Sequence, residues 1–307
     1  MISAYNRNQR LAPYVFLAPY FLLTSVFFLY PLAYATVLAF HQTNGPLSWK
    51  FVGTKNFSFV LSDPSFGKAV VNTVIYSLFS IFLQLPLSLG LAMMLNARSD
   101  KLKSFFRLAI FAPNLVGPVF VGILFGVLFA PNIGLFNQLM HLTFGWLTST
   151  NLGGNGEGFL QYQWLTNPRL VMPALIIVSL WLYVGFNMIY FLAALQGVDQ
   201  SLVEAAKIDG AGPFDIFRAV TVPAIMPVIT FVVVTATIGS FNLFELPYTL
   251  LQGFGPENSG ITIIGYLFNW VQTGDLGTAA AIGWILTLMI LVISLIQIRL
   301  SGATRKD

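Results

Sequence analysis

The residue types that usually carry enzyme chemistry are scarce in this chain of 307 residues. It has no cysteine and two histidines, His41 and His141, and neither histidine lies near a carboxylate in the sequence. No phosphate-binding G-x-x-x-x-G-K-[ST], nucleophile-elbow G-x-S-x-G or zinc-binding H-E-x-x-H pattern occurs. We therefore expect no catalytic residue, no metal site and no cofactor held by the chain itself.

A single acidic residue, Glu245, falls inside a long apolar stretch, so a catalytic pair of intramembrane carboxylates is excluded. An ionisable side chain in a membrane span is a functional candidate by default. Counted from Pro223 at about 1.5 Å per helical residue, however, Glu245 is expected near the outer end of its span. An interfacial carboxylate in contact with water and a residue of a solute path both remain open interpretations.

The composition indicates an all-α integral membrane protein. Hydrophobic residues make up 56% of the chain and charged residues 8%, whereas soluble domains carry about 25% charged residues. A membrane span needs about 20 predominantly apolar residues in a helix. The stretches that satisfy this requirement predict six transmembrane helices, at roughly 13–40, 69–95, 107–130, 170–196, 223–248 and 278–298.

Charge and loop patterns predict how these spans are arranged. Eleven of the 15 Lys and Arg residues fall on the side that holds both termini, so both termini are expected in the cytoplasm. The same asymmetry accounts for the net charge of +4 without nucleic acid. Residues 134–145, in the longest outer loop, are expected to form a short amphipathic helix. No soluble domain interrupts the spans, and we expect one membrane domain over 1–307.

Several prolines lie inside the predicted spans. A proline removes a backbone donor, which a membrane helix tolerates where neighbours or a cavity satisfy the freed carbonyl. Kinks that serve packing and direct participation in a solute path are both compatible with this pattern. The prolines concerned include Pro31, Pro86, Pro113, Pro118 and Pro173.

The cytoplasmic segment 199–223 is the most informative part of the chain. Ser201-x-x-Glu204 has the spacing of a capping box that would start a helix, and Asp209-Gly210 would end it. Gly212 followed by Pro213 would begin a second helix. The hairpin so formed carries more apolar side chains than a connector needs, and they either pack back on the spans or contact a partner. These side chains are Leu202, Val203, Ile208, Phe214 and Phe217.

This segment resembles the EAA loop of membrane subunits in binding-protein-dependent ABC importers. Glu204-Ala205-Ala206, Gly210 and Val220-Thr221-Val222-Pro223 keep the spacing of that motif. The resemblance implies a type I importer permease fold and a hairpin that couples the protein to ATPase subunits. The residues implied in ATPase coupling are Glu204, Ala205, Ala206, Asp209, Gly210, Ala211, Gly212, Phe217 and Pro223.

The segment after the fifth predicted span resembles the carbohydrate-uptake branch of that family. Phe241-Asn-Leu-Phe-Glu245 and the run that ends at Gly255-Pro256 match the branch pattern, except that Glu245 replaces the usual Asp and Phe254 separates the paired glycines. The resemblance therefore implies uptake of a sugar or sugar-like solute, and these two departures leave the identity of the solute open.

The resemblance also implies the remainder of the machinery. It comprises a second permease subunit, usually in a heterodimer, two ATP-binding cassette subunits that bind ATP and Mg²⁺, and an external solute-binding protein. The expected location is the cytoplasmic membrane of a bacterium or archaeon. Two other classes stay open: a secondary transporter that works without ATP, which predicts intramembrane charges and inverted repeats, and a scaffold subunit without a solute.

A sugar path needs hydroxyl and amide groups next to aromatic faces. Two groups of residues recur at helical spacing in the fourth and fifth predicted spans and are the candidates for such a path. Stripes of this kind also serve ordinary packing, and the pattern does not separate the two roles. The candidates are Ser179, Tyr183, Phe186 and Tyr190 in the fourth span and Phe241, Asn242 and Glu245 in the fifth.

Overall fold

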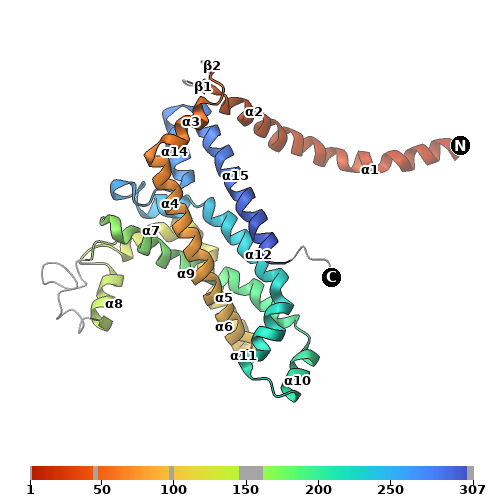
Figure 1. The fold of residues 1–307 in the computed structure, drawn as a ribbon, viewed down its shortest axis with the longest axis vertical. Coiled ribbons are helices and arrows are strands. Elements are labelled where there is room, and N and C mark those ends of the chain that lie inside the picture. The colour runs from red at the N-terminus through yellow and green to blue at the C-terminus, as the bar shows by residue number, and fades with distance from the viewer. Residues whose placement is uncertain (1, 44–47, 97–99, 145–161, 303–307) are drawn as a thin grey trace. The chain divides into compact units, whose positions relative to one another are not determined.

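The computed structural model describes residues 2–43, 48–96, 100–144 and 162–302 (Figure 1). The helices are α1 (Ile2–Thr24), α2 (Tyr30–Ala39), α3 (Lys55–Ser62), α4 (Pro64–Phe79), α5 (Leu85–Asn96), α6 (Asp100–Val116), α7 (Pro118–Leu128), α8 (Leu135–Phe144), α9 (Pro168–Gln196), α10 (Gln200–Ile208), α11 (Pro213–Ile216), α12 (Val222–Phe241), α13 (Glu245–Leu250), α14 (Ile263–Thr273) and α15 (Leu276–Leu300). A short antiparallel hairpin joins β1 (His41–Thr43) to β2 (Trp49–Phe51), with Gln42 opposite Lys50.

The chain divides into two compact units. Unit 1 comprises Met1–Asp63 and Leu267–Ile285, and unit 2 comprises Pro64–Tyr266 and Leu286–Asp307. In unit 1, the buried amide of Asn56 on α3 donates to the carbonyls of Ala39 and His41, at 3.0 and 2.9 Å, and so ties α3 to the chain between α2 and β1. Unit 2 contains the predicted ATPase-coupling residues and the predicted solute-path residues.

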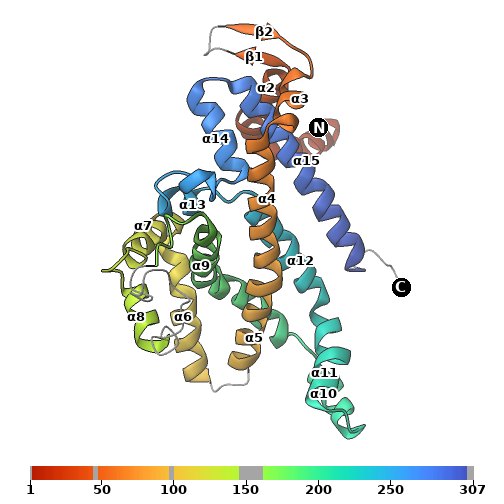
Figure 2. The same cartoon turned by 60° about the vertical axis from the view of Figure 1, so that its left-hand side comes forward.

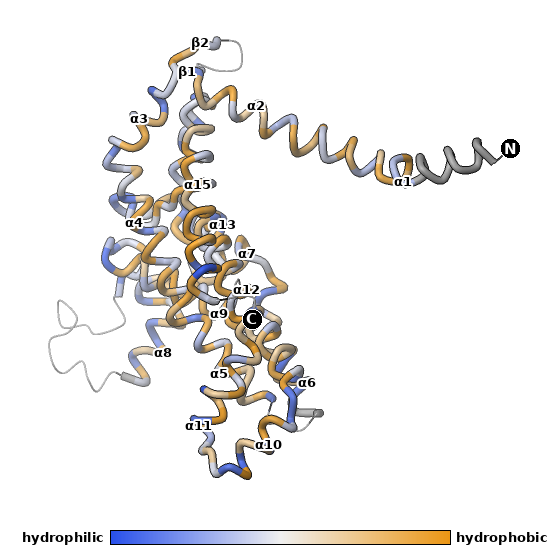
Figure 3. Tube along the Cα trace, turned by 45° about the vertical axis from the view of Figure 1, so that its right-hand side comes forward, coloured by the Kyte–Doolittle hydropathy of each residue, from blue (hydrophilic) through white to orange (hydrophobic). Residues whose placement is uncertain are grey.

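Among the described residues, five helices are long and apolar enough to cross a membrane, namely Pro13–Ala39, Pro64–Asn96, Pro168–Gln196, Pro213–Phe241 and Leu276–Leu300. A sixth candidate consists of Lys103–Val116 and Pro118–Leu128, which are bent by 95° relative to each other. Figure 3 shows how hydrophobic residues predominate along these helices. The all-α membrane fold is thus confirmed, with five continuous candidate spans and one broken one in the described part of the chain.

Two of the predicted spans differ from the structure. The stretch 107–130 is not one continuous helix, because Gly117 adopts φ +83° and the following Pro118 has no N–H to continue the helix. The stretch predicted at 223–248 begins earlier, at Pro213, and its helix ends at Phe241. Glu245 therefore lies in the separate short helix α13 and not inside a span.

Three spans contain a π-helical turn at the same distance from a proline. The turns η1 (Ser25–Leu29), η2 (Ser80–Gln84) and η6 (Phe217–Thr221) each end two residues before Pro31, Pro86 or Pro223. A proline ring clashes with the carbonyl four residues earlier in an α-helix. The wider π turn relieves this clash, and each helix passes its proline without breaking.

Helix α9 is the centre of unit 2, where it packs against α5, α6 and α12 (Figures 1 and 2). The approach of α6 is close enough that a Cβ at Gly185 would overlap the backbone carbonyl of Ile110. Small residues permit such backbone contacts between membrane helices. The first half of α9 contributes Leu175 and Leu182 to one buried cluster, and the second half contributes Met188 and Leu192 to another.

The predicted amphipathic helix in the outer loop is present as α8, with its exposed side formed by residues such as Leu139 and Leu142. Asn137 on its buried side accepts a hydrogen bond of 2.6 Å from the indole N–H of Trp164 and donates to the carbonyl of Tyr162. These contacts fix α8 to the segment that leads into α9.

Candidate functional site

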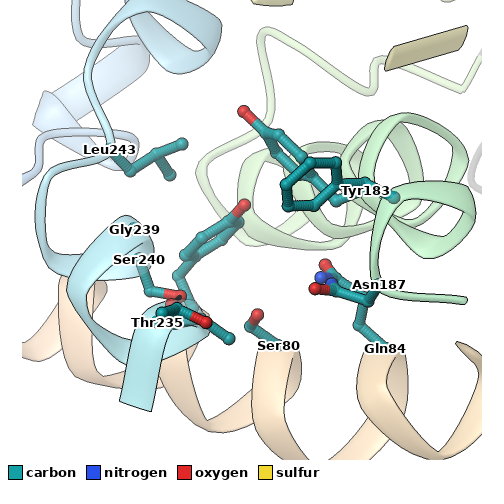
Figure 4. A pocket seen from close by; sticks show the side chains of 11 residues that line it. Ser80, Gln84, Tyr183, Asn187, Thr235, Gly239, Ser240 and Leu243 are labelled. Carbon is teal, nitrogen blue, oxygen red and sulfur yellow. Dashed lines mark hydrogen bonds between the residues drawn. The ribbon is translucent and has the colours of Figure 1, made fainter. Parts of the chain in front are cut away.

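A cavity of about 180 Å³ opens between three spans of unit 2 (Figure 4). Its walls come from α4 with η2, from the middle of α9 and from the second half of α12, elements that are far apart in the sequence but packed together. The lining residues are Tyr76, Ser80, Gln84, Tyr183, Phe186, Asn187, Thr235, Ala236, Gly239, Ser240 and Leu243.

Some polar groups of the lining are already satisfied by the protein. The hydroxyl of Tyr76 donates to Ser179 Oγ at 2.9 Å, and Ser179 in turn donates to the carbonyl of Leu175 at 2.7 Å. Thr235 and Ser240 donate to carbonyls of the preceding turn of α12, at 2.9 and 2.7 Å. Such back-bonding occupies the hydroxyl proton and leaves oxygen lone pairs available as acceptors.

Four other polar groups of the lining keep their full bonding capacity. Within the described residues, the side chains of Ser80, Gln84, Tyr183 and Asn187 have no hydrogen-bond partner. Gln84 and Asn187 are nevertheless buried, at 4% and 6% exposure, and Figure 4 shows their amides at the same end of the cavity. Since buried polar groups are normally paired, these groups are suited to bind a solute rich in hydroxyl groups, with Tyr183 and Phe186 as aromatic faces.

The structure brings only two of the predicted path residues into this cavity, Tyr183 and Phe186. Ser179 accepts a hydrogen bond from the lining residue Tyr76 but does not itself line the cavity. Tyr190 packs against Phe186 and Phe231, with ring centroids 5.3 and 5.6 Å apart. These residues of α9 therefore include packing contacts as well as cavity contacts.

The predicted path residues of the fifth span do not share one helical face, because the helix breaks after Phe241. Phe241 is buried at 2% exposure. Asn242 is exposed, and its amide donates to the carbonyl of Ile238 at 2.8 Å. Glu245 is exposed at the first position of α13. A solute contact stays a prediction for all seven of the predicted path residues, including Tyr183 and Phe186.

Sequence analysis missed most of the lining. A signal was available in the second span, where Tyr76, Ser80 and Gln84 recur every four residues, as polar groups on one helical face do. Asn187 similarly lies one turn after Tyr183. No comparable signal marks Thr235 and Ser240 among the other small residues of α12.

The second candidate site is the hairpin at the other end of α12 (Figure 2). Helix α10 begins at Gln200, and its N-cap is Asp199, whose carboxylate accepts from the Ser201 N–H at 2.8 Å. This hydrogen bond lowers the pKa of Asp199 below its usual value. The predicted capping box of Ser201 and Glu204 is therefore wrong: the cap lies two residues earlier, and Ser201 acts as the donor.

The predicted turn between the two helices is confirmed. Gly210 adopts φ +80°, Ala211 N–H donates to the carbonyl of Ala206 at 2.9 Å, and Gly210 N–H donates to that of Lys207 at 3.1 Å. This is the Schellman pattern of a helix C-terminus. Asp215 then accepts from the Gly212 N–H at 3.2 Å at the start of α11.

The second helix of the hairpin is continuous with the span. Helix α11, the π turn η6 and α12 form one helix over Pro213–Phe241, so Phe217 and Pro223 lie in this helix and not in a loop. Between α10 and this helix lies an open groove of about 420 Å³. It is lined by Leu202, Ala205, Ala206, Asp209, Ala219, Val220, Pro223 and Ala224.

Some apolar side chains of the hairpin pack back on the protein, and others are exposed and free to contact a partner. Val203 packs against the buried cluster of the second half of α9, and Phe217 is half-buried. Leu202, Ile208 and Phe214 are 54%, 86% and 70% exposed. The hairpin is thus anchored on one side and presents apolar side chains on the other.

Comparisons with known proteins show what the chain as a whole is similar to. Residues 84–306 match the family model described as binding-protein-dependent transport system inner membrane component. An arabinooligosaccharide transport system permease protein from Bacillus subtilis is 35% identical over 98% of this chain and 91% of its own length. A lactose transport system permease protein from Rhizobium radiobacter is 35% identical over 96% and 95%. A bacterial ABC transporter for import of the acidic polysaccharide alginate has the same fold, with TM-score 0.82 and 23% identity over 99% of this chain and 100% of that one.

Proposed function

Because the chain belongs to the family of binding-protein-dependent transport system inner membrane components, and is thus a multi-pass membrane subunit of an ABC importer, we propose that its cavity forms part of the path for a saccharide. The observation that carries the proposal is the continuity of Pro213–Phe241. One end of this helix belongs to the hairpin, and the other end supplies Thr235, Gly239 and Ser240 to the cavity.

The support for a saccharide has two parts. The cavity offers hydroxyl and amide groups beside aromatic rings, which matches the alternating polar and apolar faces of a sugar. The named relatives are permeases for arabinooligosaccharides and for lactose. Membership of a binding-protein-dependent family argues against the alternative of a secondary transporter that works without ATP.

The proposed mechanism begins at the hairpin. The exposed apolar side chains of Leu202, Ile208 and Phe214 would contact a separate ATPase subunit, which binds and hydrolyses ATP. A helix transmits displacement of one end along its length, here about 40 Å at about 1.5 Å per residue. Movement of the hairpin would therefore shift the α12 wall of the cavity and change the side of the membrane to which the cavity opens.

The proposed assembly contains this chain, a second permease subunit, two ATPase subunits and an external solute-binding protein. In this arrangement the hairpin and both termini face the cytoplasm. Reporter fusions after residue 210 and at the C-terminus test this orientation, since both should report the cytoplasmic side. A C-terminal reporter on the outer side would contradict it.

The test of the proposed function is reconstitution of the complete complex in liposomes. With the solute-binding protein outside and ATP inside, neutral oligosaccharides should accumulate, and the solute-loaded binding protein should raise the ATPase rate. Uptake that persists with a non-hydrolysable ATP analogue would contradict the proposal. So would failure of every saccharide in a mixture of mono- to tetrasaccharides to accumulate.

A further inference from the structure

The lining of the cavity between η2, α9 and α12 is polar but uncharged, and this bears on the charge of the solute that it can bind. Among the described residues that line it, none carries a formal charge. Its unpaired groups are the side-chain amides of Gln84 and Asn187 and the hydroxyls of Ser80 and Tyr183. An amide offers two donors and two acceptor sites, and a hydroxyl offers both roles. These groups can therefore pair with sugar hydroxyls in either direction.

The same uncharged lining would bind an anionic solute less favourably than an uncharged one. An anion that enters a site of low polarity loses its hydration, and neutral hydrogen bonds recover only part of that loss unless a cation or several charged donors compensate. The described lining offers no Lys or Arg for this purpose. A carboxylate, phosphate or sulfonate group on a sugar would therefore be held poorly.

The nearest feature outside the lining adds to this effect. Glu245 is exposed at the start of α13 and follows the lining residue Leu243 by two positions in the chain. A carboxylate in this position repels an approaching anion and does not repel a neutral sugar.

We propose that this cavity selects uncharged saccharides and excludes saccharides that carry an anionic group. The inference rests on the proposed function and narrows its substrate class. Glu245 and the uncharged amide pair of Gln84 and Asn187 are the specificity-determining residues.

The chain has no cysteine, so a single introduced cysteine is its only thiol. The rates at which charged reagents modify that thiol report the electrostatic potential in the cavity, and this measurement does not need the solute-binding protein. In the assembled complex, Ser240→Cys places one thiol in the cavity, and Ser58→Cys on the exposed side of α3 provides a reference. Each is treated with thiosulfonate reagents of similar size that are cationic, neutral or anionic, and modification of this chain is followed by mass spectrometry. Ratios of rates cancel differences in thiol reactivity between the reagents.

Relative to the reference position, the anionic reagent should modify Ser240→Cys at least about tenfold more slowly than the neutral one. Addition of Gln84→Arg should reverse the preference, because arginine keeps its charge when buried. Addition of Gln84→Met, similar in volume but uncharged, should leave the ratio unchanged. Addition of Glu245→Gln should reduce it.

Equal rates for the anionic and neutral reagents at position 240, relative to the reference position, would overturn the inference, as would a lack of reaction with all three reagents. The ratios for Ser240→Cys alone and for Ser240→Cys combined with Glu245→Gln keep the test decisive if the arginine variant does not assemble. Failure of the proposed function is distinguishable, because it would appear as absent ATP-dependent uptake while the charge ratio at position 240 persisted.

Discussion

Gly210 is the position at which the proposed coupling hairpin is most easily disturbed without loss of a contact. Its φ of +80° lies in the left-handed region, and a Cβ built there has no atom within 4 Å. Substitution therefore adds backbone strain alone. That strain is about 1–2 kcal/mol for an ordinary residue, it is larger for a β-branched one, and it is smaller for Asn, which visits this conformation more readily.

The expected consequence is a misplaced C-terminus of α10. The turn is closed by the bonds from Ala211 and Gly210 to the carbonyls of Ala206 and Lys207, and a strain of about 1.4 kcal/mol reduces the population of the native turn relative to alternatives about tenfold. The groove wall formed by Ala206 and Asp209 would lose its shape. The spans should remain folded, because the buried clusters of unit 2 lie elsewhere.

The assay is paired. Purified complexes are compared for retained ATPase subunits and for stimulation of ATP hydrolysis by the solute-loaded binding protein. Coupling should decrease in the order Gly210→Asn, Gly210→Ala, Gly210→Val. Gly212→Ala is the matched control, since Gly212 has an ordinary φ of −73° and a Cβ there approaches only the flexible Asp215 carboxylate, at 3.3 Å. Normal coupling in Gly210→Val, or equal losses in Gly210→Val and Gly212→Ala, would refute the reasoning.

Three further predictions concern transport, packing and the helix cap. Tyr183→Ala should lower the uptake rate severalfold with the complex intact, because it removes an aromatic face and a hydroxyl from the cavity; Asn242→Ala tests the more exposed candidate, and an equal loss there would extend the path beyond the cavity. Gly185→Ala should lower the thermal stability of the purified complex by several degrees, since its Cβ would overlap the Ile110 carbonyl; unchanged stability would show that α6 and α9 move apart freely. Asp199→Asn should preserve coupling whereas Asp199→Ala weakens it, and the wild-type cap should fail only as pH falls below about 3.8, because its pKa is lowered in the folded hairpin; equal coupling in both variants would contradict a role for this cap.

The sequence predicted most of the fold because the length and apolarity of a span are local properties. Four of the six predicted spans coincide with long helices within a few residues. The third was predicted as continuous because hydropathy does not register the conformation of Gly117, although the Gly117-Pro118 pair is a turn signal in itself. Hydropathy likewise extended the fifth span beyond Phe241.

The two helices of the hairpin and the turn between them could be predicted from the sequence, but the predicted N-cap of the first helix was wrong. Asp199 and Ser201 are both good N-cap residues, and the capping-box spacing to Glu204 favoured Ser201. The structure uses Asp199, two residues after Gly197 ends α9. Competition between two adjacent caps is decided by where the preceding helix ends, which the local pattern does not contain.

The cavity was the least predictable part. Its walls come from three spans, and the face that each span turns inward depends on tertiary packing. Hydrophobic periodicity is weak when the whole helix is apolar, as in α9 and α12. The aromatic stripe on α9 includes two residues that line the cavity, Tyr183 and Phe186, whereas Gln84 and Asn187 come together only because η2 lies beside α9.

The most direct test of the central claim, that this cavity lies on a path opened alternately to the two sides, uses Ser80→Cys in the otherwise cysteine-free chain. The reconstituted complex is treated from one side with a membrane-impermeant neutral thiol reagent. Without ATP, position 80 should react from the side of the hairpin; with loaded binding protein and ATP trapped by vanadate, it should react from the opposite side. Accessibility from the same side in both states, or from neither, would contradict the account.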